Sequence, residues 1–328
     1  MGVNFKDIAS PEKIELKDIE GRTIAIDAYN TIYQFLSGIR QKDGSPLKDE
    51  NGNVTSNLSG LLYRTSSIVE KGIKPIYVFD GKPSEYKAET IKKRREAKEK
   101  SEMKMKKAIA EGNDELARKY AIRTSRMSPY IVESSKELLD YMGIPWVQAS
   151  REGEAQASYM VQQKDAWAVS SQDYDCLLFG APKIIRNLTL SGGLSKLEYM
   201  ELNKVLDNLK FTREQLIDLA LLVGTDFNNG IHGIGIKRGI KLLNEKSLEN
   251  ILEDLDYKPE TDIEILRNIF LNPNVNKNYK IKFKNYDNEK IIEFLCEEHG
   301  FGKDRVNNVL KNKMKNLNVS QKSLEDWF

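Results

Sequence analysis

The chain has 328 residues, enough to bury a large core within one big domain or two smaller ones. Its 51 Lys and Arg residues nearly balance 49 Asp and Glu residues, and the net charge of +2 means that affinity for a polyanion would depend on charge distribution. No apolar run approaches a membrane span, and Lys6 stands where a myristoylation signal requires Ser or Thr, so we expect a cytoplasmic protein without a membrane partner.

Metal ligands other than oxygen are scarce in this chain. The two cysteines, Cys176 and Cys296, lie far apart without ligand spacing, which predicts reduced thiols. The histidines number only two, His232 and His299. This composition excludes a zinc site of the usual nitrogen and sulfur type and favours oxygen-only coordination of Mg²⁺ or Mn²⁺.

Two strand–helix units open the chain. Residues 22–26 form a β-branched run that ends in Asp27, and residues 29–39 follow in helical spacing. A second strand, residues 76–79, ends in Asp80. This alternation predicts an α/β fold with a mostly parallel central sheet and helices on both faces. Ligands of such sheets bind at the carboxyl ends of the strands, although an Asp after a strand is also a frequent turn residue.

Residues 82–107 carry the positive charge that the net value hides, with eleven Lys and Arg residues against five Glu. The apolar positions are few, and a break at residues 112–114 precedes a second basic helix that contains Lys119 and Arg123. We expect a helical hairpin that a partner orders; a solvated surface hairpin is the alternative. Lys87 and Arg94 are seven residues apart on one helical face and could direct two cations at a phosphate.

The densest acidic region is residues 149–175. Ser150 is a good N-cap for a helix that opens with Glu152, and residues 167–169 read as a strand that leads to a second acidic pair. Like charges this close repel one another, so such a cluster is tolerated mainly when a cation neutralises it. Acidic residues at a helix N-terminus also suit the macrodipole, which is the alternative explanation for Glu152 and Glu154.

The two acidic pairs differ in their expected geometry. Glu152 and Glu154 do not share a face of a regular helix, so both can serve one site only if the first turn is irregular, which Gly153 permits. Asp173 and Asp175, two apart in an extended segment, should project to the same side.

A glycine-rich turn follows the expected amphipathic helix at residues 211–223. Residues 230–238 place closely spaced glycines before another helix, where backbone N–H groups can approach a phosphate. Lys237 and Arg238 oppose the helix dipole and are better explained as contacts to a sugar-phosphate backbone. Taken alone, this glycine pattern matches many ordinary turns.

The C-terminal part is informative only at its end. Residues 248–318 read as several short helices with polar joints. The last eight residues place Leu324, Trp327 and Phe328 on a polar tail, which suggests a docking peptide because aromatic side chains dominate interface energetics. A tail that packs back on its own domain is the alternative.

Together these motifs resemble the flap endonucleases of archaeal and eukaryotic type, within the XPG-like structure-specific nucleases. The resemblance spans nearly the whole chain and rests on residues 26–30, 78–83, 152–155, 171–175, 224–226 and 230–235. It implies a PIN-like nuclease core in residues 1–316, with a helical arch inserted at about 82–130 and a helix–two-turn–helix element at about 216–244. Residues 317–328 would be a flexible clamp-binding tail.

The resemblance also implies roles for particular residues. The metal-binding carboxylates would be Asp27, Asp80, Glu152, Glu154, Asp173, Asp175 and Asp226. The catalytic residues would be Lys87, Arg94 and Asp175. The DNA-binding residues would be the base-stacking Tyr33 together with Lys87, Arg94, Lys119, Arg123, Gly233, Gly235, Lys237 and Arg238. The sliding clamp (PCNA) would bind Gln321, Leu324, Trp327 and Phe328.

Departures from the family pattern are few. Residues 149–152 read Ala-Ser-Arg-Glu where the family usually has Ala-Pro-Ser-Glu, and Phe227 stands where Tyr usually follows the Asp. Neither change touches a carboxylate. The chain ends at Phe328, without the basic extension of eukaryotic members, which favours an archaeal origin.

The hypothesis for function is therefore phosphodiester hydrolysis with two Mg²⁺ ions, one to activate water and one to stabilise the leaving 3′ oxygen, with Mn²⁺ as a substitute. The expected substrate is branched DNA with a 5′ flap, cut by a monomer during replication and long-patch repair, and K⁺ is expected at the glycine turn. A sister nuclease for gaps, bubbles or junctions and a non-catalytic clamp-tethered DNA-binding protein are the alternatives.

Overall fold

A seven-stranded sheet forms the centre of the structure, a computed structural model that describes residues 3–41, 43–190 and 197–314. The strand order is β1-β7-β6-β5-β2-β3-β4. The strands are β1 (Glu12–Ile14), β2 (Thr23–Asp27), β3 (Lys74–Phe79), β4 (Trp146–Gln148), β5 (Ala168–Ser170), β6 (Lys183–Arg186) and β7 (Leu197–Glu201). Four neighbouring pairs are parallel, and β7 runs antiparallel to β1 and β6, which confirms the expected mostly parallel sheet.

The register of the central strands brings their carboxyl ends together. Asp27 at the end of β2 pairs with Val78 of β3, and Ile26 pairs with Ser170 of β5. These strands are almost wholly buried, as expected when helices cover both faces of a parallel sheet. Residues that follow β2, β3 and β5 therefore emerge at one edge.

Alternate strand residues enter two hydrophobic cores, one on each face. Ala25 and Val78 belong to one core, and Ile26 and Phe79 belong to the other. The first core includes buried residues of α8 (Gly153–Gln162), α9 (Asp175–Leu178), α11 (Arg213–Val223), α12 (Ile236–Glu245), α13 (Leu248–Asp254) and α14 (Ile263–Leu271). The second includes those of α2 (Ala28–Gly38), α3 (Ser56–Gly60), α4 (Ser66–Glu70), α7 (Pro129–Tyr141), α15 (Asn288–Ile292) and α16 (Lys303–Lys313).

Several elements differ from the sequence interpretation. Between β2 and β3, the helical stretch is divided into α3 and α4 by a π-helical segment, η2 (Leu61–Thr65). Strands β1, β4, β6 and β7, of three to five residues each, were not predicted. Such short strands carry too few residues for a clear periodic pattern. The remaining short elements are α1 (Lys6–Ala9), η1 (Leu16–Ile19), η3 (Glu85–Lys87), η4 (Glu293–Glu298) and α10 (Leu202–Leu209).

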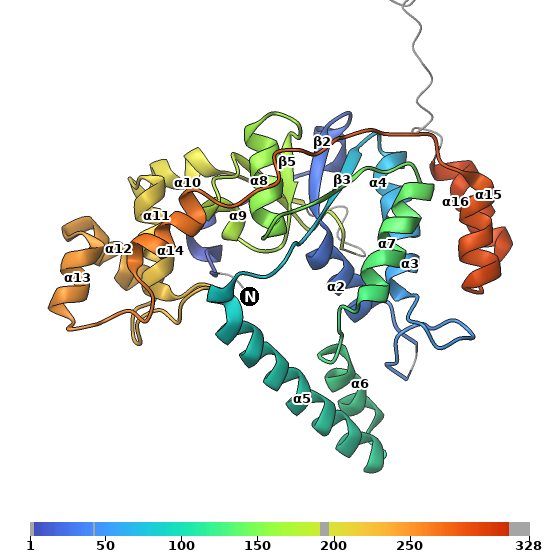
Figure 1. The fold of residues 1–328 in the computed structure, drawn as a ribbon, viewed down its shortest axis with the longest axis horizontal. Coiled ribbons are helices and arrows are strands. Elements are labelled where there is room, and N and C mark those ends of the chain that lie inside the picture. Colours follow the sequence, from blue (N-terminus) through green and yellow to red (C-terminus); the bar gives the residue numbers. More distant parts are fainter. Residues whose placement is uncertain (1–2, 42, 191–196, 315–328) are drawn as a thin grey trace, which may run out of the picture.

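The basic hairpin consists of α5 (Ala88–Ala110) and α6 (Asp114–Ile122), and it projects away from the body of the molecule (Figure 1). The two helices pack mainly on each other, and Met103 of α5 remains 64% exposed. At the base of the hairpin, the Arg40 guanidinium donates to Ser125 Oγ at 2.7 Å and to Gly44 O at 2.7 Å. Arg40, two residues after the end of α2, therefore anchors the returning end of the hairpin.

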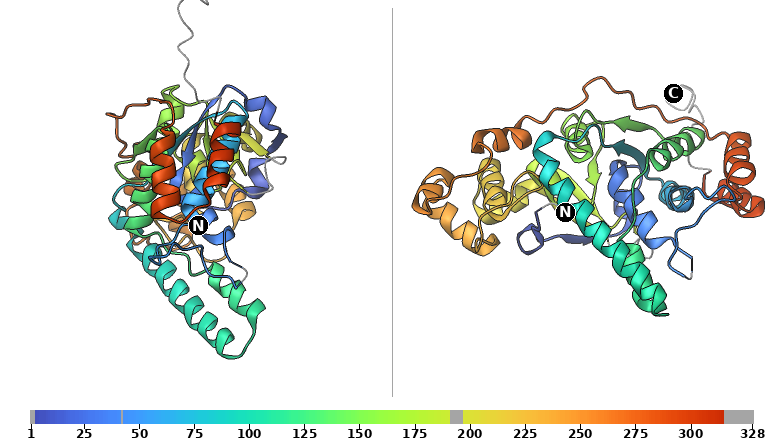
Figure 2. Two further views of the ribbon diagram at one scale, coloured as in Figure 1. Left: turned by 90° about the vertical axis from the view of Figure 1, so that its right-hand side faces the viewer. Right: turned by 60° about the horizontal axis from the view of Figure 1, so that its bottom comes forward.

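An extended segment, residues 272–287, crosses the molecule on the side opposite the hairpin (Figures 1 and 2). It connects α14 at one end of the molecule to α15 at the other. Lys284 N donates to Gly143 O at 3.0 Å, and the Gln156 side chain exchanges two hydrogen bonds with the backbone of Asn276. Among the described residues, none of the helices has the length and apolar character needed to cross a bilayer.

A buried ion pair joins α14 to α11, the helix that ends three residues before Asp226. Arg267 donates to both carboxylate oxygens of Asp218, at 2.7 and 2.9 Å, and the side chains are only 15% and 10% exposed. Replacing Arg267 with Met should lower the free energy of unfolding by about 3 kcal/mol, because Asp218 keeps a buried charge without its cation.

Urea denaturation would measure this change. Lys246→Met is the matched control, since it removes an ion pair with Asp254 whose partners are 47% and 55% exposed. The control should change the free energy of unfolding by at most about 1 kcal/mol. Equal losses of unfolding free energy in the two variants would show that the buried Arg267–Asp218 pair contributes no more stability than an exposed pair.

Candidate active site

A single cavity of about 970 Å³ opens at the carboxyl ends of the central strands. Its lining combines the candidate cations Lys87 and Arg94 with Tyr33. All seven candidate metal-binding carboxylates also line it: Asp27, Asp80, Glu152, Glu154, Asp173, Asp175 and Asp226. Residues up to 199 positions apart in the sequence therefore share one site.

Asp27 and Asp80 lie at the ends of two parallel strands, and their carboxylates accept hydrogen bonds from backbone N–H groups. Asp27 is the last residue of β2 and caps α2 by accepting a hydrogen bond from Asn30 N at 3.0 Å. Asp80 directly follows β3 and accepts one from Gly153 N at 2.7 Å. A Cβ at Gly153 would lie 2.6 Å from Asp80 Oδ1, so any other residue there would displace the Asp80 carboxylate from its present position.

The predicted start of α8 was wrong. Glu152, rather than Ser150, is the N-cap, and its φ of −78° and ψ of 127° are extended. Because Glu152 lies outside the helix and Glu154 in its first turn, the rule that residues two apart do not share a helical face does not apply. Both side chains line the cavity.

The expected extended geometry of Asp173 and Asp175 was also wrong. Tyr174 between them has φ −82° and ψ −6°, and Asp175 begins α9. A turn therefore carries both carboxylates to the cavity. Asp173 N donates to Ser171 Oγ at 3.2 Å, and Asp175 Oδ1 accepts from Val3 N at 2.9 Å, which ties the N-terminal segment to the site.

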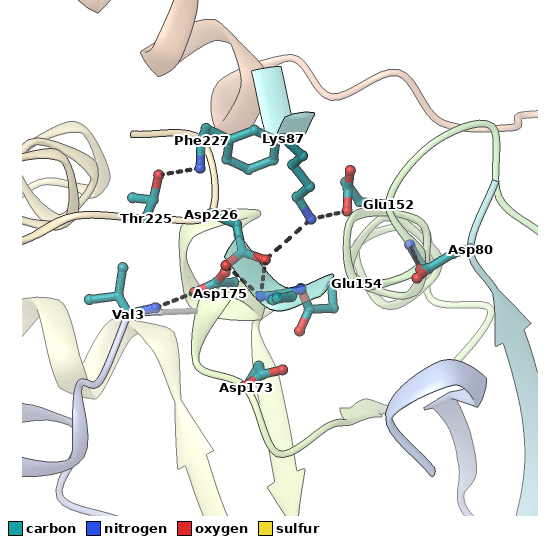
Figure 3. A network of polar contacts seen from close by, with 12 residues as sticks. Val3, Asp80, Lys87, Glu152, Glu154, Asp173, Asp175, Thr225, Asp226 and Phe227 are labelled. Atoms are coloured by element: carbon teal, nitrogen blue, oxygen red, sulfur yellow. Dashed lines mark hydrogen bonds and ion pairs between the residues drawn. The ribbon is translucent and has the colours of Figure 1, made fainter. Parts of the chain in front are cut away.

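Two cations from the start of the hairpin bind carboxylates of this cluster (Figure 3). Lys87 Nζ forms an ion pair with Glu152 and lies 3.6 Å from Asp226 Oδ2. Arg94 Nη2 donates to both oxygens of Asp226 at 2.7 Å. Lys87 Nζ also lies 4.9 Å from the centre of the Phe227 ring. The cations expected to face a phosphate here neutralise the carboxylates instead.

Burial and mutual repulsion disfavour charge on four of the other carboxylates. Burial, with the charge of Asp80, raises the pKa of Asp27 to about 7, and burial with Glu152 raises that of Asp80 to about 6. Burial and Asp226 raise the pKa of Asp175 to about 7, and burial and Asp175 raise that of Glu154 well above its usual value. The unpaired part of the cluster thus favours a bound cation.

Asp226 behaves in the opposite way. Burial acts to raise its pKa, but the charges of Lys87 and Arg94 outweigh burial and lower the pKa. A nearby cation therefore stabilises the charged form of a carboxylate in this site.

The donor set fits a hard divalent ion. All seven side chains offer carboxylate oxygens, which suit Mg²⁺ or Mn²⁺. Within residues 3–41, 43–190 and 197–314, no three Asp, Glu, His or Cys side chains converge closely enough to coordinate one ion in this arrangement. Lys87 and Arg94 hold Glu152 and Asp226, while backbone N–H groups hold Asp27, Asp80 and Asp175. Coordination would therefore require some carboxylates to rotate.

The other candidate DNA contacts divide between the cavity and outer surfaces. Tyr33 lies within the cavity, and Lys98 Nζ sits 5.0 Å above its ring. Lys119 in α6 and Arg123 after it are exposed on the hairpin and do not belong to the cavity lining.

The glycine turn lies between α11 and α12. Gly224, Gly230 and Gly233 have φ values of 110°, 66° and 80°, in the region that favours glycine, whereas Gly235 is an extended N-cap of α12. Lys237 and Arg238 in the first turn of α12 are exposed. The tail residues Gln321, Leu324, Trp327 and Phe328 lie outside the described part of the chain.

The sequence interpretation did not identify the residues that position the carboxylates. Ser171 Oγ lies 3.1 Å from Asp27 Oδ2 and 3.4 Å from Glu154 Oε1, and Asn30 Nδ2 donates to Asp173 Oδ2 at 3.3 Å. The partners in these contacts lie 17 to 144 residues apart in the sequence, so no local pattern signals them.

Comparisons with known proteins agree with this geometry. The XPG N-terminal domain matches residues 1–101, and the XPG I-region matches residues 143–226. Flap endonuclease 1 of Methanobrevibacter smithii is 59% identical over 328 residues, which cover 100% of both chains.

Solved structures show the same fold. The flap endonuclease-1 from Methanococcus jannaschii matches with a TM-score of 0.79 at 45% identity, covering 96% of this chain and 98% of that one. The Holliday junction-resolving enzyme GEN1, solved with product DNA, Mg²⁺ and Mn²⁺ ions, matches in fold with a TM-score of 0.65 at 19% identity, covering 94% and 76%. From the full-length identity to its relatives, the chain belongs to the flap endonuclease 1 family.

Proposed function

We propose that this protein is a structure-specific 5′ flap endonuclease with 5′-3′ exonuclease activity, which hydrolyses DNA phosphodiesters during Okazaki fragment maturation and long-patch base excision repair. The observation that carries the proposal is the single cavity lined by seven carboxylates and by two cations of a projecting basic hairpin. Family membership supports the same activity.

The seven carboxylates would hold two Mg²⁺ ions, with Mn²⁺ as a substitute. The raised pKa values of Asp27, Asp80, Glu154 and Asp175 support this, because a divalent cation would stabilise their charged forms. Bound ions would supply a Lewis acid for the phosphate and would lower the pKa of water, while the carboxylates would hold the ions without acting as nucleophiles.

Lys87 and Arg94 would change partners when DNA binds. In the DNA-free arrangement they neutralise Glu152 and Asp226. Divalent ions compete for these same carboxylates, and a scissile phosphate offers the released cations a new anionic partner. Both cations would then stabilise the charge that develops on the phosphate.

The outer elements would recognise the branched substrate. Residues of about 82–130 would form a helical arch for the displaced 5′ strand, with Lys119 and Arg123 on its surface and Tyr33 as a base-stacking platform. Residues of about 216–244 would form a helix–two-turn–helix element that binds duplex backbone through Gly233, Gly235, Lys237 and Arg238, with a K⁺ ion. We further propose a cytoplasmic monomer whose nuclease domain spans residues 1–316.

Removing one carboxylate tests the metal site. Asp175→Asn keeps an oxygen to accept the Val3 N–H but loses a charge, so cleavage of a labelled 5′ flap substrate should slow about a thousandfold, since metal ions supply several kcal/mol. Affinity for the flap DNA in EDTA should stay near wild type.

Asp207→Asn is the matched control, because Asp207 is exposed on α10, and its cleavage rate should not change. Substrates with gaps, bubbles and four-way junctions belong in the same assay. Wild-type cleavage by Asp175→Asn at saturating Mg²⁺ would contradict the metal assignment, and preference for junctions over flaps would indicate a sister nuclease.

The role of Lys87 is tested by separating chemistry from binding. Lys87→Ala should lower the single-turnover rate by about 100-fold, in the range expected for losing one preorganised charge at a transition state, with a smaller effect on the dissociation constant. Lys92→Ala is the control, because Lys92 lies on α5, shortly after Lys87, and is exposed. A wild-type single-turnover rate in Lys87→Ala would refute the phosphate-stabilising role.

The tail prediction concerns residues 317–328. Replacing both Trp327 and Phe328 with Ala should weaken binding to the sliding clamp at least about 30-fold, as expected when two aromatic anchors are lost, without lowering basal cleavage. Titration calorimetry with purified clamp would measure this. Unchanged affinity would exclude these residues as the clamp motif.

A further inference from the structure

One face of α2 carries polar residues from the acidic cluster along the wall of the cavity. Asp27 caps this helix, and Asn30 and Gln34, at helical spacing, both line the cavity. The sequence interpretation assigned neither amide a role. Their contacts, however, lead directly to the carboxylate of Asp173.

The contacts form a continuous chain of hydrogen bonds. Asn30 Nδ2 donates to Asp173 Oδ2 at 3.3 Å, and Gln34 Nε2 donates to Asn30 Oδ1 at 2.5 Å. Thr189 Oγ1 donates to Gln34 Oε1 at 3.1 Å. Thr31 Oγ1 lies 3.4 Å from Thr189 Oγ1, and both threonines are at most 3% exposed. The buried end of this chain is thus fixed within the core.

The direction of every donor follows from the charge on Asp173. An ionised carboxylate only accepts hydrogen bonds, so Asn30 must present its NH₂ group to Asp173 and its oxygen to Gln34. Gln34 must then turn its own NH₂ group towards Asn30, which leaves its oxygen to accept from Thr189. A single reversed amide would place two acceptors face to face.

Asp173 accepts a side-chain hydrogen bond from Asn30, whereas Glu152 and Asp226 form ion pairs with Lys87 and Arg94. Figure 3 shows Lys87 between Glu152 and Asp226, with Asp173 below them in that view. The charge of Asp173 acts on Asp27, Glu154 and Asp175 alike. Repulsion from these carboxylates would otherwise rotate its side chain.

We propose that Asn30, Gln34 and Thr189 form a chain of hydrogen bonds with fixed donor directions, here called the relay. This relay fixes Asp173 in the orientation that binds a divalent ion. Asn30 is then a positioning residue, and Gln34 acts through it. The inference rests on the proposed metal site and adds the residues that orient one of its ligands. Partners of this kind commonly change metal affinity by about 10- to 100-fold when they are removed.

The test measures Mn²⁺ binding to the full chain without DNA, by electron paramagnetic resonance of the free ion. Asn30→Leu removes the donor at similar size and should weaken one Mn²⁺ site by about 10- to 100-fold. Gln34→Glu is isosteric but has no NH₂ group, so it should turn the Asn30 amide and weaken the same site, despite its added negative charge. Ser37→Ala is the control, because Ser37, further along α2, contacts Ser125 rather than a carboxylate.

The two amide substitutions separate the relay from simpler explanations. A general charge effect would make Gln34→Glu bind Mn²⁺ more tightly than wild type, and that result would overturn the relay. Wild-type Mn²⁺ affinity in Asn30→Leu would overturn it as well. Thermal unfolding of each variant confirms that the fold is intact, and cleavage rates at saturating Mn²⁺ should recover in both variants.

Failure of the proposed function would look different. If the wild-type chain itself bound no Mn²⁺, the metal site would be wrong. If the wild-type chain bound Mn²⁺ and cleaved flaps while both variants matched it, only the relay would be wrong.

Discussion

Repulsion among seven buried or half-buried carboxylates is the constraint on which the rest of the site depends. Charges this close in a region of low dielectric constant raise one another's pKa, and only nearby donors or cations offset the effect. The structure offers backbone N–H groups to Asp27, Asp80 and Asp175, and it offers cations to Glu152 and Asp226. Asn30 supplies a side-chain donor to Asp173. Each of these contacts therefore offsets part of the repulsion among the carboxylates.

The parallel sheet brings the carboxylates together and is therefore the origin of their repulsion. It also places a helix N-terminus beside them, which partly offsets that repulsion. Because β2, β3 and β5 end at one edge, the residues that follow them meet without any long-range adjustment. The glycine at position 153 lets α8 approach Asp80 closely, so that a helix N-terminus meets the cluster. The helix dipole there adds positive potential, which partly offsets the negative charge.

The hairpin links this electrostatic balance to function. Lys87 directly precedes α5 and Arg94 lies within it, and the hairpin of α5 and α6 makes most of its packing contacts with itself. Releasing them from Glu152 and Asp226 requires another cation for the carboxylates and another anion for the hairpin. A divalent ion and a phosphate together satisfy both requirements. In our account, metal binding, substrate binding and the position of the hairpin are therefore coupled.

Local sequence patterns were sufficient for the three central strands β2, β3 and β5 but not for the shorter outer strands or for the fine geometry of the site. The strands before Asp27 and Asp80 were predictable because buried parallel strands read as continuous apolar runs. The start of α8 at Gly153 and the turn at Tyr174 were not, because contacts from distant segments, such as Gly153 N to Asp80 and Val3 N to Asp175, override local preference. The role of Asn30 depends on Asp173, 143 residues away, which no local pattern reveals.

The most direct test of this account is an anomalous diffraction experiment on DNA-free crystals soaked in Mn²⁺. The account predicts two Mn²⁺ peaks within the cavity bounded by Asp27, Asp80, Asp173 and Asp175. Crystals that show no Mn²⁺ in this cavity, with the Lys87–Glu152 and Arg94–Asp226 pairs intact, would contradict it.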